Sequence, residues 1–328
     1  MDLIDEWSVL GGNMSIRIMG TGSYLPEKVV TNEDFEKIVD TSDEWITTRT
    51  GIKSRHYADG MTNVQMSMIA AREALKDAGL TKDDIGGIIV ATVTNDMNVP
   101  SVASQLQRAF DIEDCFAFDV NAACTGFMYA LKVASAMIAE SEKPLLVVGT
   151  ETLSRFTNFS DRASCILFGD GAGAVMVCAG DNLKYIKVYS KPDYNNTIEI
   201  MGMNNYENGQ IKPTYITLKG QEVYKYATRE VEAVVNKAYE ELGIGSEDID
   251  WFLMHQANIR IIQTAAKRLN TSMDKFYINI QEVANTSAAS IPIALDEMNK
   301  KGLLKEGQRL LIAGFGGGLT SGCAVYEF

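Results

Sequence analysis

Apolar and polar residues recur along the chain with two different periods. Near the first quarter of the sequence, apolar positions are spaced by three or four residues, at Met68, Ala71, Leu75 and Ala78. Gly79 follows directly, so the spacing predicts an amphipathic helix that ends at this glycine. The β-branched run "DDIGGIIVATVT" comes next. Helical periods that alternate with short apolar runs are typical of an α/β protein.

The same order of elements recurs in the second half. The helical segment "VEAVVNKAYEELGI" leads into "EDIDWFLMHQAN", and matching Ile85 to Ile249 gives an offset of 249 − 85 = 164, half of the 328 residues. "CFAFDVNAACTGF" and "PLLVVGTETLS" align more loosely with "KFYINIQEVANTSAAS" and "RLLIAGFGGGLTS". This internal repeat predicts two similar α/β halves, residues 14–180 and 181–328. Residues 1–13 are interpreted as an N-terminal extension, with Met14 as the functional start.

Composition narrows the class of protein. With 46% hydrophobic and 22% charged residues, the chain resembles an ordinary globular protein. A net charge of −13 argues against a nucleic-acid-binding protein, which needs a basic surface. The start "MDLIDEWSVLGGN" lacks a basic signal-peptide region, and no apolar run approaches the roughly 20 residues of a membrane span. A cytoplasmic protein without membrane contacts is therefore expected.

The cysteines indicate reduced thiols. Their number is odd and no CxxC pair occurs, which argues against a disulfide framework and a structural metal site. The five positions are Cys115, Cys124, Cys165, Cys178 and Cys323.

Cys124 is a candidate nucleophile. It lies in "VNAACTGFMYAL", between the strand-like "CFAFDV" and apolar residues at helical spacing from Phe127 to Ile138. Its sulfur is thus predicted near a helix N-terminus, where unpaired N–H groups and the positive dipole end favour a thiolate and lower the thiol pKa. Small residues around it leave room for a substrate. Since buried cysteines also pack as small apolar residues, the local pattern supports packing and reactivity equally.

Two further polar residues follow apolar runs. His255 ends "IDWFLMHQAN" and is expected at the C-terminal edge of a buried strand, where α/β sites usually lie, although a structural role is commoner for a single histidine. The other histidine, His56 in "IKSRHYADG", is predicted in a surface loop. Asn285 in "ANTSAAS" follows the strand-like "FYINI", at the level of Cys124 in the repeat. Its amide could donate to an enolate oxygen or cap a turn.

Two glycine-rich stretches differ in their context. "LFGDGAGAVMV" lacks GxGxxG spacing, and β-formers follow it where a dinucleotide site would open a helix, so a nucleotide site is rejected. "GFGGGLTSG", residues 314–322, follows the strand-like "RLLIA" and could bring backbone N–H groups close to a substrate carbonyl or form a tight turn.

Several ordered motifs together resemble β-ketoacyl-acyl-carrier-protein synthase III, the initiating condensing enzyme of bacterial fatty-acid synthesis. They are "SDEWITTRTGI", "AACTGF", "FGDGAGA", "HQAN", "NTSAAS" and "FGGGLTSG". The resemblance runs from about residue 15 to the end of the chain. It implies the thiolase-like fold, in which two βαβαβαββ halves form five αβαβα layers, and a homodimer.

The resemblance also implies roles for residues. Cys124 would take an acyl group from acyl-CoA, with the backbone N–H groups of Cys124 and Gly317 as the oxyanion hole. His255 and Asn285 would stabilise the enolate formed when malonyl-acyl-carrier protein loses CO₂, which favours a neutral His255. The products would be 3-oxoacyl-carrier protein, CO₂ and CoA. No cofactor and no metal ion are expected.

Binding residues follow from the same resemblance. Trp45, Arg49 and Arg162 match positions that hold CoA. Arg260, Lys267 and Arg268 on one predicted helix would bind the acidic carrier protein, with Lys219 and Lys225 as an extension of the patch or, alternatively, as solvated surface. Val99, where some acetyl-preferring members carry a bulky aromatic at the dimer interface, suggests an acyl pocket with room for a longer or branched primer.

Other condensing enzymes fit less well. Elongating synthases use two active-site histidines, whereas His56 lies in the wrong region. Thiolases need a second cysteine before the terminal glycine loop, whereas Cys323 follows it. A 3-hydroxy-3-methylglutaryl-CoA synthase needs an acid near Cys124, and "NAACTGF" supplies none. The alternatives are a related condensing enzyme of specialised metabolism, a cysteine thioester hydrolase and, against the complete Cys-His-Asn set, a silent acyl-CoA-binding protein.

Overall fold

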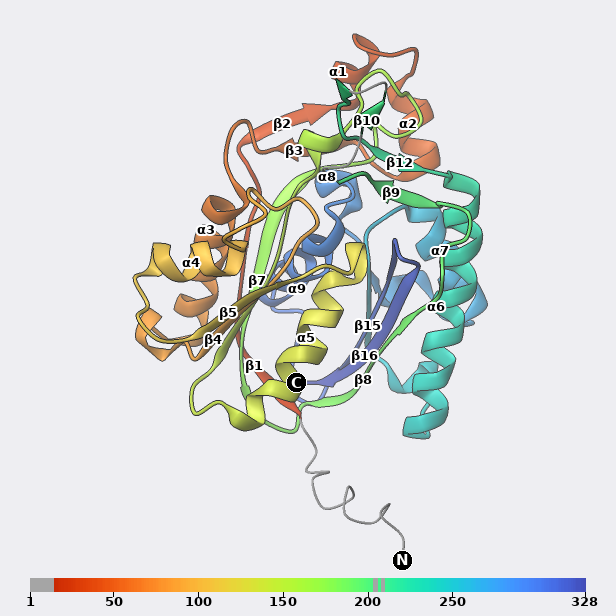
Figure 1. Cartoon of the computed structure of the whole chain (residues 1–328). Coiled ribbons are helices and arrows are strands. Elements are labelled where there is room, and N and C mark those ends of the chain that lie inside the picture. Colours follow the sequence, from red (N-terminus) through yellow and green to blue (C-terminus); the bar gives the residue numbers. More distant parts are fainter. Residues whose placement is uncertain (1–14, 203–205, 208–209) are drawn as a thin grey trace, which may run out of the picture.

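Two five-stranded sheets form the centre of the molecule (Figure 1). The computed structural model describes residues 15–202, 206–207 and 210–328. The predicted N-terminal extension, residues 1–13, and Met14 lie outside the described residues.

The two sheets have the same strand order and the same pairing directions. The first has the order β1-β7-β6-β4-β5 and the second β8-β16-β15-β13-β14. The first comprises β1 (Ile16–Tyr24), β4 (Gly87–Ala91), β5 (Phe116–Val120), β6 (Leu145–Thr152) and β7 (Asp170–Ala179). The second comprises β8 (Leu183–Ser190), β13 (Trp251–Met254), β14 (Phe276–Tyr277), β15 (Arg309–Gly316) and β16 (Thr320–Glu327). In both sheets the second strand from one edge, β4 or β13, pairs parallel with both of its neighbours.

Helices cover both sheets and fill the space between them (Figure 1). The outer layers are α3 (Asn63–Ala78) and α4 (Val102–Phe110) on the first sheet, and α6 (Gly220–Leu242) and α7 (Ile259–Arg268) on the second. The central layer is α5 (Gly126–Met137) and α9 (Ser290–Lys300). The predicted five-layer αβαβα arrangement of two similar halves is confirmed. A domain boundary near residue 180 stays a prediction.

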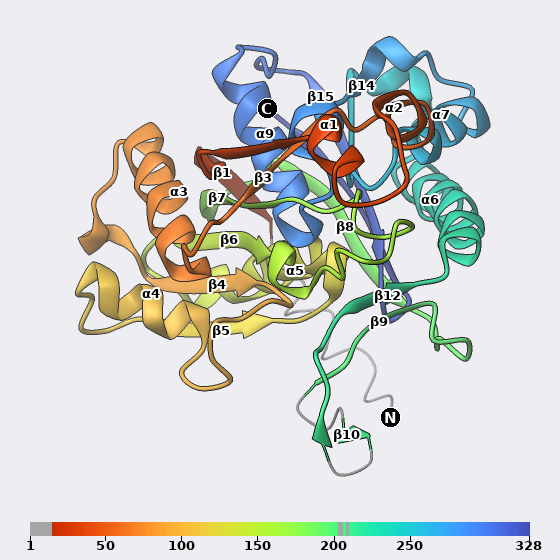
Figure 2. The ribbon, with the colours of Figure 1, turned by 90° about the horizontal axis from the view of Figure 1, so that it is seen from above.

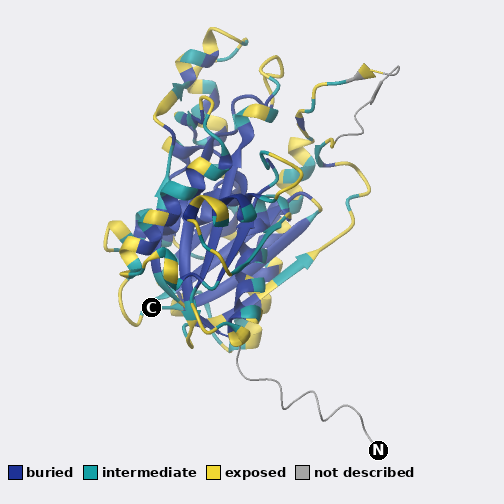
Figure 3. Cartoon of the chain, turned by 60° about the vertical axis from the view of Figure 1, so that its left-hand side comes forward, coloured by how far each residue is buried: buried dark blue, intermediate teal, exposed yellow. Residues whose placement is uncertain are grey.

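Sequence signals explain where the predicted helices begin and end. Thr62 caps α3 by accepting a hydrogen bond from the Gln65 N–H, and the Gln65 side chain accepts one from the Thr62 N–H. Gly79 ends the helix in the left-handed region, with φ of 68°. Buried residues concentrate in the sheets and the central layer, while exposed residues gather on the outer helices and loops (Figure 3). Burial on both faces explains why the strand-forming runs are nearly continuous in hydrophobicity.

Two insertions lie at the C-terminal ends of the central parallel strands. One contains β2 (Lys28–Thr31), α1 (Asn32–Glu36), α2 (Asp43–Thr50) and β3 (Ser54–Tyr57). The other contains β9 (Ile198–Ile200), β10 (Tyr206–Glu207), β11 (Gln210–Ile211) and β12 (Ile216–Leu218), and Figure 2 shows β10 at its outer end. These insertions place side chains around the ends of the strands, where the predicted site residues lie.

Three local predictions need correction or comment. The strand-like "FYINI" forms only the two-residue β14, because the short helix α8 (Ile280–Val283) begins at its last residue. His56 does not lie in a surface loop: it belongs to β3, is partly buried, and its Nδ1 lies 2.5 Å from the Pro26 carbonyl oxygen. "LFGDGAGAVMV" leads into β7, as its β-forming residues predicted.

Among the described residues, no helix is both long and apolar enough to cross a bilayer.

Candidate active site

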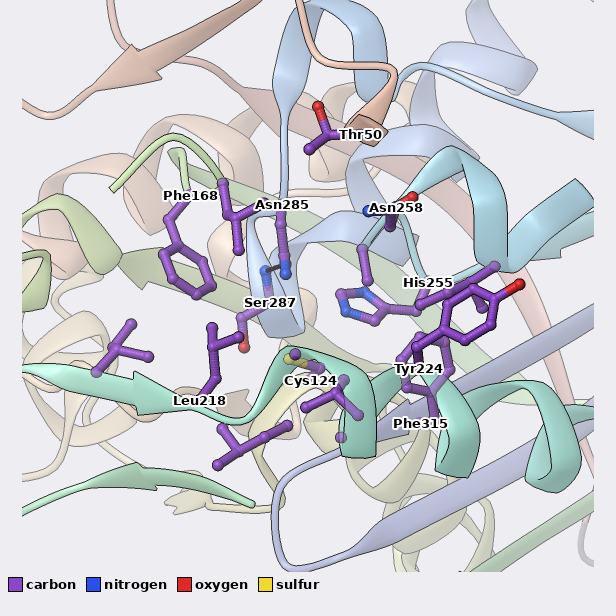
Figure 4. Close-up of a pocket in the computed structure, with 18 of the residues that line it drawn as sticks. Thr50, Cys124, Phe168, Leu218, Tyr224, His255, Asn258, Asn285, Ser287 and Phe315 are labelled. Carbon is purple, nitrogen blue, oxygen red and sulfur yellow. Dashed lines mark hydrogen bonds between the residues drawn. The ribbon is translucent and has the colours of Figure 1, made fainter. Parts of the chain in front are cut away.

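A cavity of about 850 Å³ contains all three predicted catalytic residues, Cys124, His255 and Asn285 (Figure 4). The cavity lies between the two halves, at the ends of their central strands. Its wall is largely apolar, with a few polar side chains that converge on Cys124. The apolar residues on the side of β9 and β12 are Val93, Leu153, Leu167, Phe168, Ile198, Ile200, Ile216 and Leu218. The described part of the chain contains no group of three or more His, Cys, Asp or Glu residues arranged to hold a metal ion.

Cys124 lies in a tight turn immediately before α5. The turn is a single 3-10 helical segment, Ala123–Thr125, and α5 begins at Gly126. Ala123 has φ of 45°, a left-handed conformation that is costly for a residue with a side chain and that often marks a functional site. Gly316 makes room for this turn, since a Cβ there would lie 2.8 Å from the Cys124 backbone nitrogen. The predicted location at a helix start is therefore correct.

The predicted low pKa of the Cys124 thiol is wrong. Burial raises the pKa to about 11, and the nearby Glu151 carboxyl raises it further, whereas a hydrogen bond with Ser287 acts in the opposite direction. Desolvation of the thiolate thus outweighs the field of the helix N-terminus. The resting thiol carries its proton at neutral pH and needs a route by which to lose it.

His255 is buried directly after β13, at the position that the apolar run predicted. Its Nδ1 lies 2.6 Å from Ser290 Oγ at the start of α9, and its ring meets the Phe315 ring edge-on at 5.3 Å. Burial lowers the pKa of His255 to about 3. The imidazole is therefore neutral at physiological pH, as the resemblance implied, and it carries one N–H that can donate.

Asn285 is held by hydrogen bonds on its backbone and on its side-chain oxygen. Its backbone pairs with the segment before β7 through Leu167 and Gly169. The Asn285 Oδ1 accepts a hydrogen bond of 2.9 Å from the Ser287 N–H (Figure 4). Because the oxygen is engaged in this way, the amide presents its nitrogen as the end available for donation.

The internal repeat is preserved at the level of single residues in the site. The turn Ser287–Ala289 before α9 corresponds to Ala123–Thr125 before α5, with an offset of 287 − 123 = 164. Ser287 has φ of 48°, close to the 45° of Ala123. Asn121 corresponds to Asn285 at the same offset, and each side-chain oxygen faces the N–H two residues later. Two copies of one local motif therefore supply the two groups: the thiol comes from the turn of the first copy, and the amide comes from the residue two positions before the turn of the second.

The terminal glycine-rich stretch forms the hairpin between β15 and β16. Gly316 lines the cavity beside Cys124, whereas Gly317 lies against Ala123 and Ile198 and lines a neighbouring cavity. Thr320 holds the base of the hairpin to the cysteine turn, since its Oγ1 lies 2.6 Å from Thr125 Oγ1. The oxyanion role of the Cys124 and Gly317 N–H groups stays a prediction.

The predicted CoA-binding residues gather at the mouth of the cavity. The guanidinium carbons of Arg49 and Arg162 lie 4.7 Å and 5.0 Å from the centre of the Trp45 ring. Trp45 and Arg49 line the cavity and belong to α2, while Arg162 comes from the loop before β7 and donates a 2.8 Å hydrogen bond to the Asp40 carbonyl oxygen. The structure thus brings the three residues together around one indole.

The predicted carrier-protein residues lie on the exposed face of α7. Arg260 is the second residue of the helix, lines the cavity and donates to the Thr48 carbonyl oxygen over 3.0 Å, while Lys267 and Arg268 end the helix. Arg268 pairs with Glu232 at 2.8 Å, which reduces its free charge. The extension residues are exposed as well: Lys225 lines the cavity and pairs with Glu222, and Lys219 bonds to the Asn195 carbonyl oxygen.

Val99 does not line the active-site cavity of its own chain. Its exposed fraction is 85%, the residue lies in the loop before α4, and Met97 in the same loop is half exposed. The predicted contribution of Val99 to an acyl pocket therefore requires a second copy of the chain.

Sequence reasoning missed two residues, Glu151 and Ser287. Glu151 is the residue before the last of β6 and is completely buried, and Ser287 lines the cavity between Asn285 and Cys124 (Figure 4). The expectation that no acid lies near Cys124 holds for its sequence neighbours only, since Glu151 acts on the thiol through space. The available signal was the carboxyl of Glu151 directly after the apolar run "LLVVGT". Such a run predicts a buried position, and charged residues rarely occupy buried positions.

Comparisons with known proteins agree with this geometry. The sequence model of 3-oxoacyl-[acyl-carrier-protein] synthase III matches residues 118–191, and that of its C-terminal part matches residues 239–328. The chain is similar to β-ketoacyl-[acyl-carrier-protein] synthase III of Clostridium acetobutylicum, with 47% identity over 322 residues that cover 96% of this chain and 99% of the relative.

Solved structures show the same fold. The crystal structure of 3-oxoacyl-[acyl-carrier-protein] synthase III from Aquifex aeolicus is 42% identical and superposes with a TM-score of 0.90, covering 96% of this chain and all of the other. The priming β-ketosynthase of the R1128 polyketide pathway is 30% identical, with a TM-score of 0.91 and coverage of 95% and 96%.

Proposed function

The chain belongs to the β-ketoacyl-acyl-carrier-protein synthase III family, and we propose from this premise how its residues divide the reaction. The enzyme is an acyltransferase of the condensing type that initiates fatty-acid biosynthesis. It transfers a short acyl group from acyl-CoA to Cys124 and then joins it to malonyl-acyl-carrier protein. The observation that supports this assignment best is one cavity that holds a thiol, a neutral imidazole and an oriented amide.

In the first half-reaction, the Cys124 sulfur attacks the thioester carbonyl of acyl-CoA and CoA leaves. Exchange of one thioester for another is nearly balanced in energy, so the acyl enzyme stays reactive. We propose that the N–H groups of Cys124 and Gly317 stabilise the oxyanion. The close approach of the glycine hairpin to the cysteine turn, which Gly316 permits, supports this assignment.

In the second half-reaction, malonyl-carrier protein loses CO₂ and the resulting enolate attacks the acyl enzyme. Asn285 donates from its amide nitrogen to the enolate oxygen, and His255 donates from its neutral ring. The Ser290 hydroxyl at Nδ1 supports this role, since a serine that donates there leaves the ring proton on Nε2. The steps use protein groups and the two substrates alone, so no cofactor is proposed.

The entrance of the cavity is the proposed binding site for both carriers. Trp45 with Arg49 and Arg162 offers an indole face and positive charge to the adenine and phosphates of CoA. The exposed cations of α7 offer local positive charge to the acidic carrier protein, despite a net charge of −13 for the whole chain.

A homodimer is proposed as the working form. β5 is an edge strand of the first sheet, and its Phe116 and Phe118 are only partly buried in the single chain. Val99 projects from a neighbouring loop with 85% exposure. Pairing of two β5 edges would cover these groups and bring Val99 toward the acyl pocket of the partner, where its small size would admit a longer or branched primer.

Fatty-acid synthesis is favoured over a specialised pathway. Relatives with 42% to 47% identity carry the synthase III name, whereas the polyketide priming enzyme is 30% identical.

A cytoplasmic location stays a prediction.

The test follows the acyl group by mass. Incubation with acetyl-CoA should add one acetyl group at Cys124, and malonyl-carrier protein should then remove it as 3-oxoacyl product with release of CO₂. His255→Ala and Asn285→Ala should still acylate but should lose decarboxylation. His56→Ala is the matched control, because the other histidine of the chain lies outside the cavity.

The outcomes separate the alternatives. Unmodified Cys124 contradicts the synthase, and release of the acyl group by water without malonyl-carrier protein favours a thioester hydrolase. Equal loss of both half-reactions in the His255 and Asn285 variants contradicts the assigned roles.

A further inference from the structure

Glu151 is a buried carboxyl that the two proposed half-reactions do not use. It lies next to the C-terminal end of β6 with no exposed surface. Its oxygens accept hydrogen bonds from the Val93 N–H at 3.1 Å and the Thr92 hydroxyl at 3.1 Å, and from the Thr94 hydroxyl at 2.5 Å. Burial raises the pKa of Glu151 to about 7 despite these donors, so the group can change protonation near neutral pH.

Strand geometry points Glu151 toward the central layer of the molecule. Alternate residues of a strand share a face, so Glu151 lies on the same side of β6 as Leu145, Val147 and Gly149. Leu145 and Val147 belong to the core between the two sheets. Gly149 brings the turn before α9 directly onto this face, since a Cβ there would lie 2.3 Å from the Ala288 carbonyl oxygen.

This contact places Ser287 between Glu151 and the nucleophile. The Ser287 side chain lies close enough to both the Cys124 thiol and the Glu151 carboxyl to lower the pKa of each. Figure 4 shows Ser287 directed from the Asn285 side toward Cys124. The backbone conformation of Ser287, with φ of 48°, is unfavourable for a residue with a side chain, so the turn retains this hydroxyl at some energetic cost.

We propose that Glu151 accepts the proton of Cys124 through the Ser287 hydroxyl when the thiol is acylated. This inference rests on the proposed function and supplies the proton acceptor that it lacks. His255 is a poor acceptor for this proton, because its burial opposes the charged imidazolium. Glu151 touches no substrate and acts through Ser287.

The proton balance closes without a further reagent. As the Cys124 sulfur bonds to the thioester carbonyl carbon, its proton passes to Ser287 Oγ and the Ser287 hydroxyl proton passes to the Glu151 carboxylate. The bond between the carbonyl carbon and the CoA sulfur then breaks with its electron pair on sulfur. The proton returns through Ser287 to the CoA thiolate, and Glu151 is again ionised.

Few other charged groups face Glu151. Toward the central layer, Cys124 is a titratable group whose pKa the Glu151 charge raises, and residues 126–131 of α5 and 290–295 of α9 contribute Tyr129 but no Asp, Glu, His, Lys or Arg. On β7, Asp170 accepts from Ser154 and from the Ala58 N–H. Arg155, the nearest cation along the chain, pairs with Asp96. Among the described residues, none of these charged groups pairs with Glu151.

The proposed proton transfer from Cys124 through Ser287 to Glu151 is called the relay below. It is tested in the full chain by measuring how the reactivity of the Cys124 thiol depends on pH. The rate of Cys124 alkylation by iodoacetamide is measured by mass from pH 5 to pH 9, and the rate of acetylation by acetyl-CoA is measured beside it. Glu151→Gln removes the acceptor. Ser287→Gly removes the hydroxyl, keeps the N–H that orients Asn285 and suits a positive φ. Asp296→Asn is the matched control, because Asp296 is also fully buried and accepts from two hydroxyls, of Thr21 and Ser23.

The relay predicts an alkylation rate that rises near the titration of Glu151 in the wild type. Glu151→Gln and Ser287→Gly should lose this rise and react at least tenfold more slowly at pH 7.5, while Asp296→Asn keeps the wild-type profile. Superimposable profiles for folded Ser287→Gly and the wild type overturn the relay. Alkylation that follows the relay prediction, without any acetylation of the wild type, overturns the proposed function and leaves the relay intact.

Discussion

Replacing Gly149 by alanine tests how the two halves are held together at the active site. Gly149 lies in β6, where the added Cβ would be 2.3 Å from the Ala288 carbonyl oxygen and 2.9 Å from the Ala288 carbonyl carbon. Both obstacles are backbone atoms, so no side-chain rotation relieves the contact. The turn Ser287–Ala289 has to move away from β6.

The size of the effect follows from that displacement. A carbon and an oxygen atom in ordinary contact are about 3.3 Å apart, so the turn must shift by roughly 1 Å, and overpacking of this kind costs about 1–3 kcal/mol. A misplacement of about 1 Å at a reacting group can reduce a rate by about 10²-fold. Because Asn285 and Ser290 flank the moving turn, decarboxylation should suffer more than acetylation of Cys124.

The assays are a thermal melt and the two half-reactions measured separately. Gly149→Ala should melt several degrees lower and lose about 100-fold in decarboxylation. Gly202→Ala is the matched control, since nothing lies within 4 Å of the Cβ that it adds. Unchanged melting and unchanged decarboxylation in Gly149→Ala would refute the argument that β6 and this turn are in direct backbone contact.

Three further predictions concern charge and ligand binding. Burial raises the pKa of Glu151 to about 7, above about 4.3 for an exposed glutamate, so its contribution to stability is full below pH 4 and is lost as pH rises to 7. Denaturant unfolding should therefore show Glu151→Gln more stable than the wild type by up to about 3 kcal/mol at pH 8 and similar to it near pH 4. Trp45→Ala should raise KM for acetyl-CoA about tenfold in steady-state kinetics without changing KM for malonyl-carrier protein. Lys267→Glu should raise KM for malonyl-carrier protein but not for acetyl-CoA, and should do so more than Arg268→Glu, because Glu232 already partly neutralises Arg268.

The sequence by itself determined the order and type of the main elements. Strands buried on both faces, such as β6, read as continuous apolar runs, and the amphipathic α3 reads as a three-and-four spacing that ends at Gly79. The offset of 164 correctly predicted two similar halves, and it recurs between the turns of Ala123 and Ser287. Burial along one element depends on residues close in sequence, so local periodicity records it.

The chemical candidates were also recognisable. Cys124, His255 and Asn285 follow apolar runs, and the structure brings all three to one cavity. Their positions at strand ends and helix starts are local properties, which is why the sequence located them. Their roles in the reaction still depend on the proposed experiments.

Only the tertiary structure decided the electrostatic state of the site. The thiol pKa of Cys124 was predicted to be low from the helix start alone, whereas burial by both halves raises it to about 11. Glu151 and Ser287 are 287 − 151 = 136 positions apart, and no local pattern links them. Desolvation and contacts through space sum over groups from every part of the chain. For this reason the sequence could locate the nucleophile, while the fold determined its protonation and the residues available to take its proton.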